Sequence, residues 1–249
     1  MQALDFSVVS LNLARERDVA SIVHELTSNA KLTNADVFMF QEVAGQTKAA
    51  NVAEAVAREL GYFVVAIPSS SESPDQGLAI LSRHPLSDAK TIPLKRFDLR
   101  FHSRIRFAIA ATVMTPQGPM RVWDVHLDSR INADDRVEQL APVLEDARGH
   151  AVSVIGGDLN TTHFQWLLNV LPSSRSSTQV RTIRGAFERA EFRSPLANEL
   201  VTFPFLGQHL DWIFARGLQA GRSGVTPMDF SDHYAVWADF HMADSSITR

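Results

Sequence analysis

Val154-Ile155-Gly156-Gly157-Asp158-Leu159-Asn160 is the stretch of sequence that most strongly constrains the fold. An apolar run from Ala151 to Ile155 ends in two glycines, and a carboxylate and a carboxamide follow. The apolar run predicts a short buried strand, and the glycines permit close backbone approach. Because strand side chains alternate between two faces, Asp158 and Asn160 are expected to point the same way. A buried strand that ends in polar side chains predicts a functional pocket.

Four other predicted strand ends carry polar groups of similar kinds: Asn12, Gln41-Glu42, His126, and the late cluster of Asp211 with Asp232-His233. Each group has a structural interpretation when it is taken alone. A lone Glu42 is typical of a surface carboxylate or helix cap, and His126 fits a core histidine. Asn12 and Asp232 fit turns, and Asp211 fits a structural ion pair. The recurrence of the pattern at five strand ends favours a common site.

Length and composition are those of a soluble globular protein. The chain has 249 residues, of which 45% are hydrophobic and 21% are charged. This length fits one large α/β domain or two small ones. Because no low-complexity linker interrupts the chain, we expect one domain over residues 1–249, with 241–249 as a loose tail. The absence of cysteine excludes disulfides, thiolate zinc sites and a cysteine nucleophile.

The sequence contains no sign of a membrane span. No apolar run approaches the roughly 18 residues that a spanning helix needs. Residues 1–5 lack the basic and then apolar start of a secretory signal. We therefore expect a cytoplasmic protein, although secretion stays open if a leader has been removed. No obligate protein partner is evident.

The overall charge is mildly acidic, at -4, with a pI near 6.1. Such a chain has no global basic field that would attract nucleic acid. The best local basic patch comprises Lys95, Arg96, Arg100, Arg104 and Arg106, interleaved with Phe97, Phe101 and Phe107. A solvated loop that leads into an edge strand is the favoured interpretation, and a nucleic-acid groove is the alternative.

Strands and helices are predicted to alternate along the chain. Strands are expected at 6–13, 36–41, 62–67, 78–81, 92–94, 105–114, 120–126, 151–155, 209–214 and 234–240. Helices are expected at 17–28, 49–60, 134–147, 164–169 and 182–189, and loops at 69–75 and 172–179. The turn at 115–119 predicts an antiparallel hairpin. Mixed connections of this kind favour two packed sheets with helices on their outer faces.

Four carboxylates lie at the edges of apolar stretches, where an unpaired buried charge is costly: Glu42, Asp158, Asp211 and Asp232. A divalent cation would compensate them. Sites rich in Asp, Glu and Asn oxygens suit Mg²⁺ or Mn²⁺ rather than zinc, and such ions also bind substrate phosphates. His126 and His233 add groups that can donate protons near neutral pH. The predicted partner is a phosphoester.

These motifs together resemble a known family. The ordered series is Ser10-Leu11-Asn12, Gln41-Glu42-Val43, residues 77–83, Val125-His126-Leu127, Gly157-Asp158-Leu159-Asn160, residues 210–214 and Ser231-Asp232-His233. It resembles the endonuclease/exonuclease/phosphatase superfamily, with its deoxyribonuclease I-like fold, over almost the whole chain. The resemblance implies an α/β fold, a four-layer α-β-β-α sandwich with two mixed, mainly antiparallel central sheets. It also implies a metal-dependent phosphoester hydrolase.

Carried over residue by residue, the resemblance implies a metal site and its ligands. Glu42 would be the main ligand of Mg²⁺ or Mn²⁺, and Asn12 and Asp232 would complete or support the metal environment. Such an ion places positive charge beside the phosphoryl oxygens, where negative charge grows during displacement at phosphorus.

The resemblance also implies catalytic roles. Asp158 would orient and deprotonate the attacking water, and Asn160 would hydrogen-bond the nucleophile and a phosphoryl oxygen. Asp211 would orient His233, whose ring would stabilise charge on the phosphate. His126 would contact the phosphate and protonate the leaving oxygen. In-line displacement at phosphorus needs this combination of groups.

Within the family, the sequence favours a nuclease-like phosphodiesterase that acts on nucleic acid or on a small phosphodiester. Ala14 and His126 replace an acidic residue and a tyrosine that abasic-site nucleases carry, which weakens that assignment. A phosphomonoesterase or a lipid or sugar-phosphate phosphatase is the alternative. A catalytically silent binding module is the alternative of another class, but it would be expected to have lost Glu42, Asp158 or His233.

Overall fold

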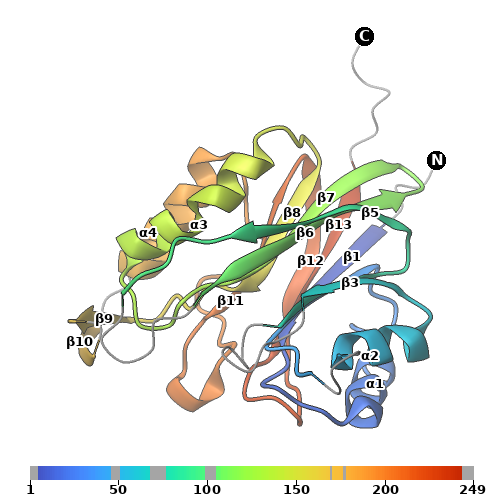
Figure 1. The fold of residues 1–249 in the computed structure, drawn as a ribbon, viewed down its shortest axis with the longest axis horizontal. Helices are drawn as coiled ribbons and strands as arrows, with labels where there is room; N and C mark the ends of the chain where they lie inside the picture. The colour runs from blue at the N-terminus through green and yellow to red at the C-terminus, as the bar shows by residue number, and fades with distance from the viewer. Residues whose placement is uncertain are drawn as a thin grey trace.

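Two β-sheets lie face to face in the computed structural model, which describes residues 5–45, 51–67, 77–98, 105–168, 170–175 and 178–242 (Figure 1). The larger sheet contains, in spatial order, β12 (Leu218–Thr226), β13 (Ala235–Met242), β1 (Asp5–Asn12), β2 (Val37–Gln41), β4 (Leu78–Ser82) and β3 (Phe63–Ile67). The smaller contains β11 (Asp211–Arg216), β8 (Ser153–Asp158), β7 (Gly118–His126), β6 (Phe107–Thr115) and β5 (Leu86–Pro93).

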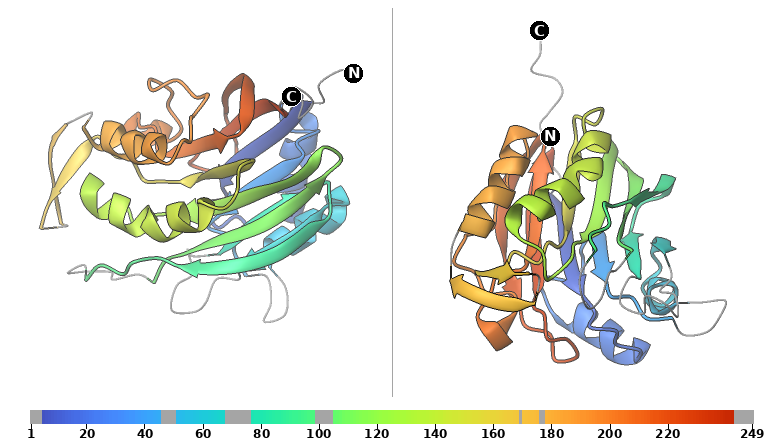
Figure 2. Two further views of the ribbon diagram at one scale, coloured as in Figure 1. Left: turned by 90° about the horizontal axis from the view of Figure 1, so that it is seen from above. Right: turned by 60° about the vertical axis from the view of Figure 1, so that its left-hand side comes forward.

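Helices cover the outer face of each sheet. Figures 1 and 2 show α1 (Val19–Ser28) and α2 (Val52–Leu60) on the larger sheet, and α3 (Ala133–Ala147) and α4 (Thr178–Arg189) on the smaller. Three apolar clusters correspond to the three interfaces between these layers. The sandwich of four layers that the resemblance implies is therefore confirmed.

The apolar side chains of the middle cluster join the two sheets. Val8 and Met39 from the larger sheet pack in it with Val122, Val154 and Ile213 from the smaller. All five are buried. Burying apolar side chains contributes about 1.5–3 kcal/mol each, so this interface fixes the position of the strand ends that carry the polar groups.

Sheet topology brings those strand ends to one edge of the sandwich. β1 pairs with β2 in parallel, so that Asn12 lies beside Gln41, and β7 pairs with β8 in parallel, so that His126 lies beside Asp158. β11 is antiparallel to β8 and begins with Asp211 opposite Asp158. Parallel strands end at the same edge, and an antiparallel neighbour begins there.

The two glycines before Asp158 serve two different contacts. A Cβ on Gly156 would lie 2.3 Å from Met39 Cε, so this glycine makes room for the packing of the two sheets. Gly157 has a φ of 138°, and a Cβ there would lie 1.9 Å from the backbone oxygen of Val125. The close backbone approach that the sequence predicts is therefore found at Gly157, whereas Gly156 makes room for a side chain.

Two expectations after Asn160 are wrong. The helix expected at 164–169 is a strand, β9 (Phe164–Leu167), which pairs with β10 (Leu171–Arg175). Asn132 holds the backbone of Trp166 extended, because its side chain accepts from Trp166 N at 2.8 Å and donates to Trp166 O at 3.0 Å. Accordingly, the loop expected at 172–179 contains the end of β10 and the first residues of α4.

Other differences concern the edges of the sheets. The strand expected at 92–94 is the end of β5, which begins at Leu86 and contains a bulge between Ser87 and Lys90. β12 was not expected, because its sequence LQAGRSGVT lacks an apolar alternation, and most of its residues are at least partly exposed. Of the tail expected at 241–249, His241 and Met242 belong to β13. The remaining tail residues and the loop expected at 69–75 lie outside the described residues.

No helix among the described residues is long and apolar enough to cross a membrane.

Candidate active site

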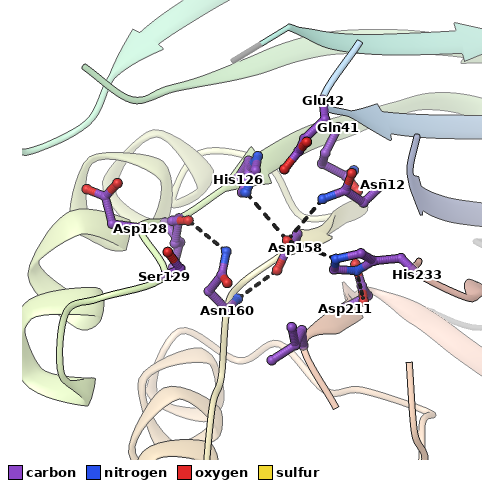
Figure 3. Close-up of polar contacts among 12 residues, drawn as sticks. Asn12, Gln41, Glu42, His126, Asp128, Ser129, Asp158, Asn160, Asp211 and His233 are labelled. Atoms are coloured by element: carbon purple, nitrogen blue, oxygen red, sulfur yellow. Dashed lines mark hydrogen bonds and ion pairs between the residues drawn. The ribbon is translucent and has the colours of Figure 1, made fainter. Parts of the chain in front are cut away.

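Asp158 lies at the centre of a buried polar cluster at this edge of the sandwich (Figure 3). Its Oδ2 accepts from Asn12 Nδ2 at 3.2 Å and lies 3.4 Å from His126 Nε2. His233 Nε2 lies 4.0 Å from the same oxygen. Side chains from β1, β7 and the loop before β13 therefore converge on one carboxylate.

His233 is held by the carboxylate of Asp211. His233 Nδ1 lies 2.8 Å from Asp211 Oδ2, and that oxygen also accepts from Thr202 Oγ1 at 2.6 Å. Both ring and carboxylate are buried. Because the Nδ1 side of the ring faces Asp211, Nε2 faces Asp158 and is available to a substrate.

Glu42 follows β2 in a left-handed conformation, with a φ of 50°. Such a backbone is unfavourable for a residue with a Cβ, and strained residues of this kind cluster at functional sites. Figure 3 shows the Glu42 side chain directed toward the space between His126 and Asn12. Arg15, which also has a positive φ, pairs with Glu42 at 3.5 Å from the exposed side.

Asn160 lies beside Asp158, but not by strand alternation. β8 ends at Asp158, and Asn160 has a φ of 50°. Its backbone N–H donates to Asp158 Oδ1 at 2.9 Å, and its side-chain Nδ2 donates to Leu127 O at 2.9 Å. The expected proximity is therefore found, but a tight turn produces it rather than an extended strand.

Asp232 differs from the other predicted site residues because it is exposed. It precedes His233 directly, and its charge contributes to the raised pKa of that ring. The buried cluster thus contains Asn12, His126, Asp158, Asp211 and His233, with Glu42 beside it and Asp232 on its outer side.

Burial and neighbouring charge change the protonation of the two central groups. Burial, and after it the Asp211 carboxylate, raise the pKa of Asp158 to about 7. Burial alone would lower the pKa of His233, but the charge and the hydrogen bond of Asp211, with the charges of Asp158 and Asp232, together outweigh it and raise that pKa to about 10. Near pH 7 the site therefore combines an imidazolium with a carboxyl group that is poised to accept a proton.

The donor atoms fit a hard divalent cation. Asp158, Asp211 and His233 have ligand atoms within 4.8 Å of one another, but an imidazolium hydrogen-bonded to Asp211 cannot ligate a metal. Negative charge remains on the side of Glu42 and Asp158, and Asp211 Oδ1 is buried with no hydrogen-bond partner among the described residues. Carboxylate oxygens of this kind suit Mg²⁺ or Mn²⁺, so Glu42 is the residue that would mainly hold the ion, with Asn12 beside it.

The sequence alone assigns no role to two residues that support the site, Thr202 and Ser231. Thr202 is fully buried, and its hydroxyl also accepts from the backbone N–H of Leu210 and of Asp211. Ser231 Oγ donates to Asn12 O at 2.7 Å and accepts from His233 N at 3.0 Å. Ser231 could have been found from its place directly before Asp232, whereas no local pattern distinguishes Thr202.

Part of the predicted basic patch is structural. Arg106 is buried, and its Nε donates to Asp128 Oδ1 at 3.0 Å, so it does not contribute to a basic surface. Lys95 and Arg96 are exposed, and residues 99–104 lie outside the described residues. Arg136 is also buried, and it donates to Ser129 O and to Gln179.

Comparison with known proteins identifies similar sequences and folds. The family model described as "Endonuclease/Exonuclease/phosphatase family" matches residues 9–233. The structure is similar to an endonuclease/exonuclease/phosphatase from Beutenbergia cavernae, with a TM-score of 0.72 and 18% identity, over 98% of this chain and 73% of that one. No curated protein sequence matches the chain closely enough to add a relative.

Two further solved structures share the fold. The human Nocturnin catalytic domain with bound sulfate has a TM-score of 0.70 at 16% identity, with 96% of this chain and 95% of that chain covered. TDP2 of D. rerio in complex with a single-strand DNA product has a TM-score of 0.65 at 16% identity, with 95% and 99% covered. At these identities the likeness establishes the fold.

Proposed function

The chain belongs to the endonuclease/exonuclease/phosphatase family, and from this premise we propose that it is a divalent-metal-dependent phosphodiesterase of nuclease-like type. The observation that carries the proposal is the arrangement of Asp158 and His233. A buried carboxyl group with a pKa of about 7 lies 4.0 Å from an imidazolium that a second carboxylate holds in place. A base poised near neutral pH beside a fixed cation suits hydrolysis of an anionic ester.

Asp158 and His233 take opposite parts in the proposed reaction. Asp158 accepts a proton from water as the water oxygen forms its bond to phosphorus and the ester P–O bond breaks. His233 donates from Nε2 to a non-bridging phosphoryl oxygen, where negative charge increases. Asp211 touches neither water nor phosphate in this scheme and acts as the positioning residue of His233.

His126 and Asn160 complete the proposed set of catalytic residues. His126 lies 3.4 Å from Asp158 and gives a proton to the leaving oxygen, which would otherwise depart as an alkoxide. Asn160 lies beside the carboxylate and orients the water through its amide. Asn12 fixes Asp158 Oδ2 by its hydrogen bond.

Glu42, with Asn12 and the exposed Asp232 in support, would hold Mg²⁺ or Mn²⁺. When bound, the ion supplies positive charge for the phosphoryl oxygens. The carboxylates of the site favour a diester substrate, because they repel a monoanionic diester less than a dianionic monoester. A phosphomonoesterase remains the competing substrate assignment.

The test is hydrolysis of bis(4-nitrophenyl) phosphate and of 4-nitrophenyl phosphate. The diester is expected to be the better substrate, and activity should disappear with chelator and return with Mg²⁺ or Mn²⁺. Asp158→Asn, which preserves volume but removes the base, should lower kcat by roughly 10²–10⁴-fold. Near wild-type turnover in this variant would exclude Asp158 as the base.

Asp134→Asn is the matched control. Asp134 is an exposed carboxylate in the first turn of α3, and its replacement should leave kcat unchanged. Thermal unfolding of both variants separates loss of catalysis from loss of folding. A protein that hydrolyses neither ester with either metal would contradict the proposed function and would favour the binding-module alternative.

A further inference from the structure

A short loop beside the candidate site is fixed at both ends. The backbone N–H groups of Thr202 and Phe203 donate to Gln208 O, each at 2.9 Å, and Gln208 N donates to Phe203 O at 3.1 Å. Tyr234 N, next to His233, donates to Thr202 O at 2.7 Å. Because Thr202 also binds Asp211, this loop has a defined position relative to the Asp211–His233 pair.

Two aromatic rings lead outward from His233 along this loop. The Phe203 ring centroid lies 5.0 Å from that of His233, and the Phe205 ring lies 6.3 Å from Phe203 at 67°. Phe205 belongs to the 3₁₀ turn η1 (Pro204–Leu206) and is 84% exposed. Partly buried Phe203 is thus the inner ring, and Phe205 is the outer ring that faces solvent.

We propose that Phe203 and Phe205 form a stacking platform for a nucleobase that belongs to the phosphodiester substrate. This inference rests on the proposed function, because it places the scissile phosphate at His233. A group esterified to that phosphate must lie within a few bonds of His233, and the inner ring contacts this histidine. Bases stack on aromatic side chains irrespective of sequence, because every base has a flat π-face.

A nucleobase fits this surface better than a protein partner. The exposed apolar residues described around the loop are Val201, Phe205 and Leu206. A stable protein interface uses roughly 20–30 residues on each side, whereas one base covers one ring. The fixed loop also favours stacking, because little conformational entropy is lost when a flat ligand binds a preformed ring.

The first experiment compares two esters with the same leaving group, thymidine 5′-(4-nitrophenyl) phosphate and methyl 4-nitrophenyl phosphate. Phe205→Ala should raise KM for the thymidine ester roughly tenfold, with kcat within about twofold, and should leave both constants for the methyl ester unchanged. Phe205→Trp should restore KM. Equal effects on the two esters, or no effect on either, would overturn the platform.

Phe63→Ala is the matched control. Phe63 is 49% exposed and begins β3. It pairs with Ser82, at the end of the larger sheet that is far from Gln41 and from the site. Its replacement removes the same exposed ring at a distance from the site and should change neither KM. A rise in KM for the thymidine ester in this variant would show that the effect is not specific to the loop.

The second experiment measures binding without hydrolysis, by fluorescence anisotropy of a fluorescein-labelled oligothymidylate in EDTA. Phe205→Ala should raise Kd roughly tenfold, and Phe205→Trp should restore it. An unchanged Kd, or no binding by the wild-type protein, would overturn the platform. Because this measurement needs no turnover, it decides the inference even if the proposed function fails with both esters.

Discussion

His233 Nδ1 lies 2.8 Å from Asp211 Oδ2, in a pair that is almost fully buried at the edge where the two sheets meet. The carboxylate keeps the ring protonated, and the ring presents Nε2 to Asp158. The negative charge of Asp211 therefore stabilises a positive charge on His233, and this positive charge faces the candidate substrate position.

Asp211→Asn should remove this stabilisation of the protonated His233 ring. The amide preserves the volume and can still accept from Thr202, but it no longer compensates the imidazolium, so burial lowers the pKa of His233 from about 10. We expect kcat to fall roughly 10²–10⁴-fold, while KM changes little. An NMR titration of the His233 ring would measure the pKa directly. If the ring still titrates near pH 10 in the variant, Asp211 is not the cause of the shift.

Glu42→Gln should weaken the metal site. The variant removes a charge but preserves the side-chain length, so the Mg²⁺ concentration for half-maximal activity should rise at least about tenfold. The Mg²⁺-induced increase in Tm should decrease in parallel, and this readout does not depend on turnover. Glu188→Gln, on the exposed face of α4, is the control. An unaltered Mg²⁺ dependence in Glu42→Gln would exclude Glu42 as a main ligand.

The sequence predicts the residues that gather at the site because their positions follow from strand periodicity. Apolar runs that end at Asn12, Gln41, His126 and Asp158 predict buried strands, and the helical crossover connections make two of the pairs parallel. Within each sheet a common edge then follows from strand direction, and the packing of the two sheets brings the two edges together. The left-handed turn at Glu42 is not predictable in this way, since no glycine or asparagine indicates it.

Contacts between distant residues account for what the sequence does not predict. Residues 164–167 are extended because Asn132, more than 30 positions away, binds both backbone groups of Trp166. Thr202 supports Asp211 across nine positions without a local motif. Both cases are side-chain hydrogen bonds to a partner that tertiary packing supplies, and no propensity or period encodes them.

Arg106→Met tests the reassignment of this residue from a basic surface to the interior. Removal of the guanidinium leaves Asp128 buried with Gln139 as its one remaining side-chain donor among the described residues, so the free energy of unfolding should fall by roughly 3–5 kcal/mol. Arg96→Met, an exposed counterpart, should change it by less than about 0.5 kcal/mol. Urea unfolding followed by fluorescence measures both. Equal stability of the two variants would contradict the interior position of Arg106 and would favour its assignment to the basic surface patch.

The ring of His209 should make folding stability depend on pH. His209 is buried and stacks on Trp212, with centroids 3.7 Å apart, and burial lowers its pKa to about 4. Between about pH 6.5 and pH 4 the unfolded chain takes up a proton that the folded ring does not, so the free energy of unfolding should decrease as the pH falls, by about 2–3 kcal/mol at pH 4.5. His209→Phe keeps a stacked ring that cannot titrate, and should therefore remove this part of the decrease between pH 7 and pH 4.5 in urea unfolding. His24→Gln, at an exposed position of α1, should show the same decrease in the free energy of unfolding as the wild-type protein. If His209→Phe shows the same decrease as the wild-type protein, protonation of another group causes the loss of stability in acid.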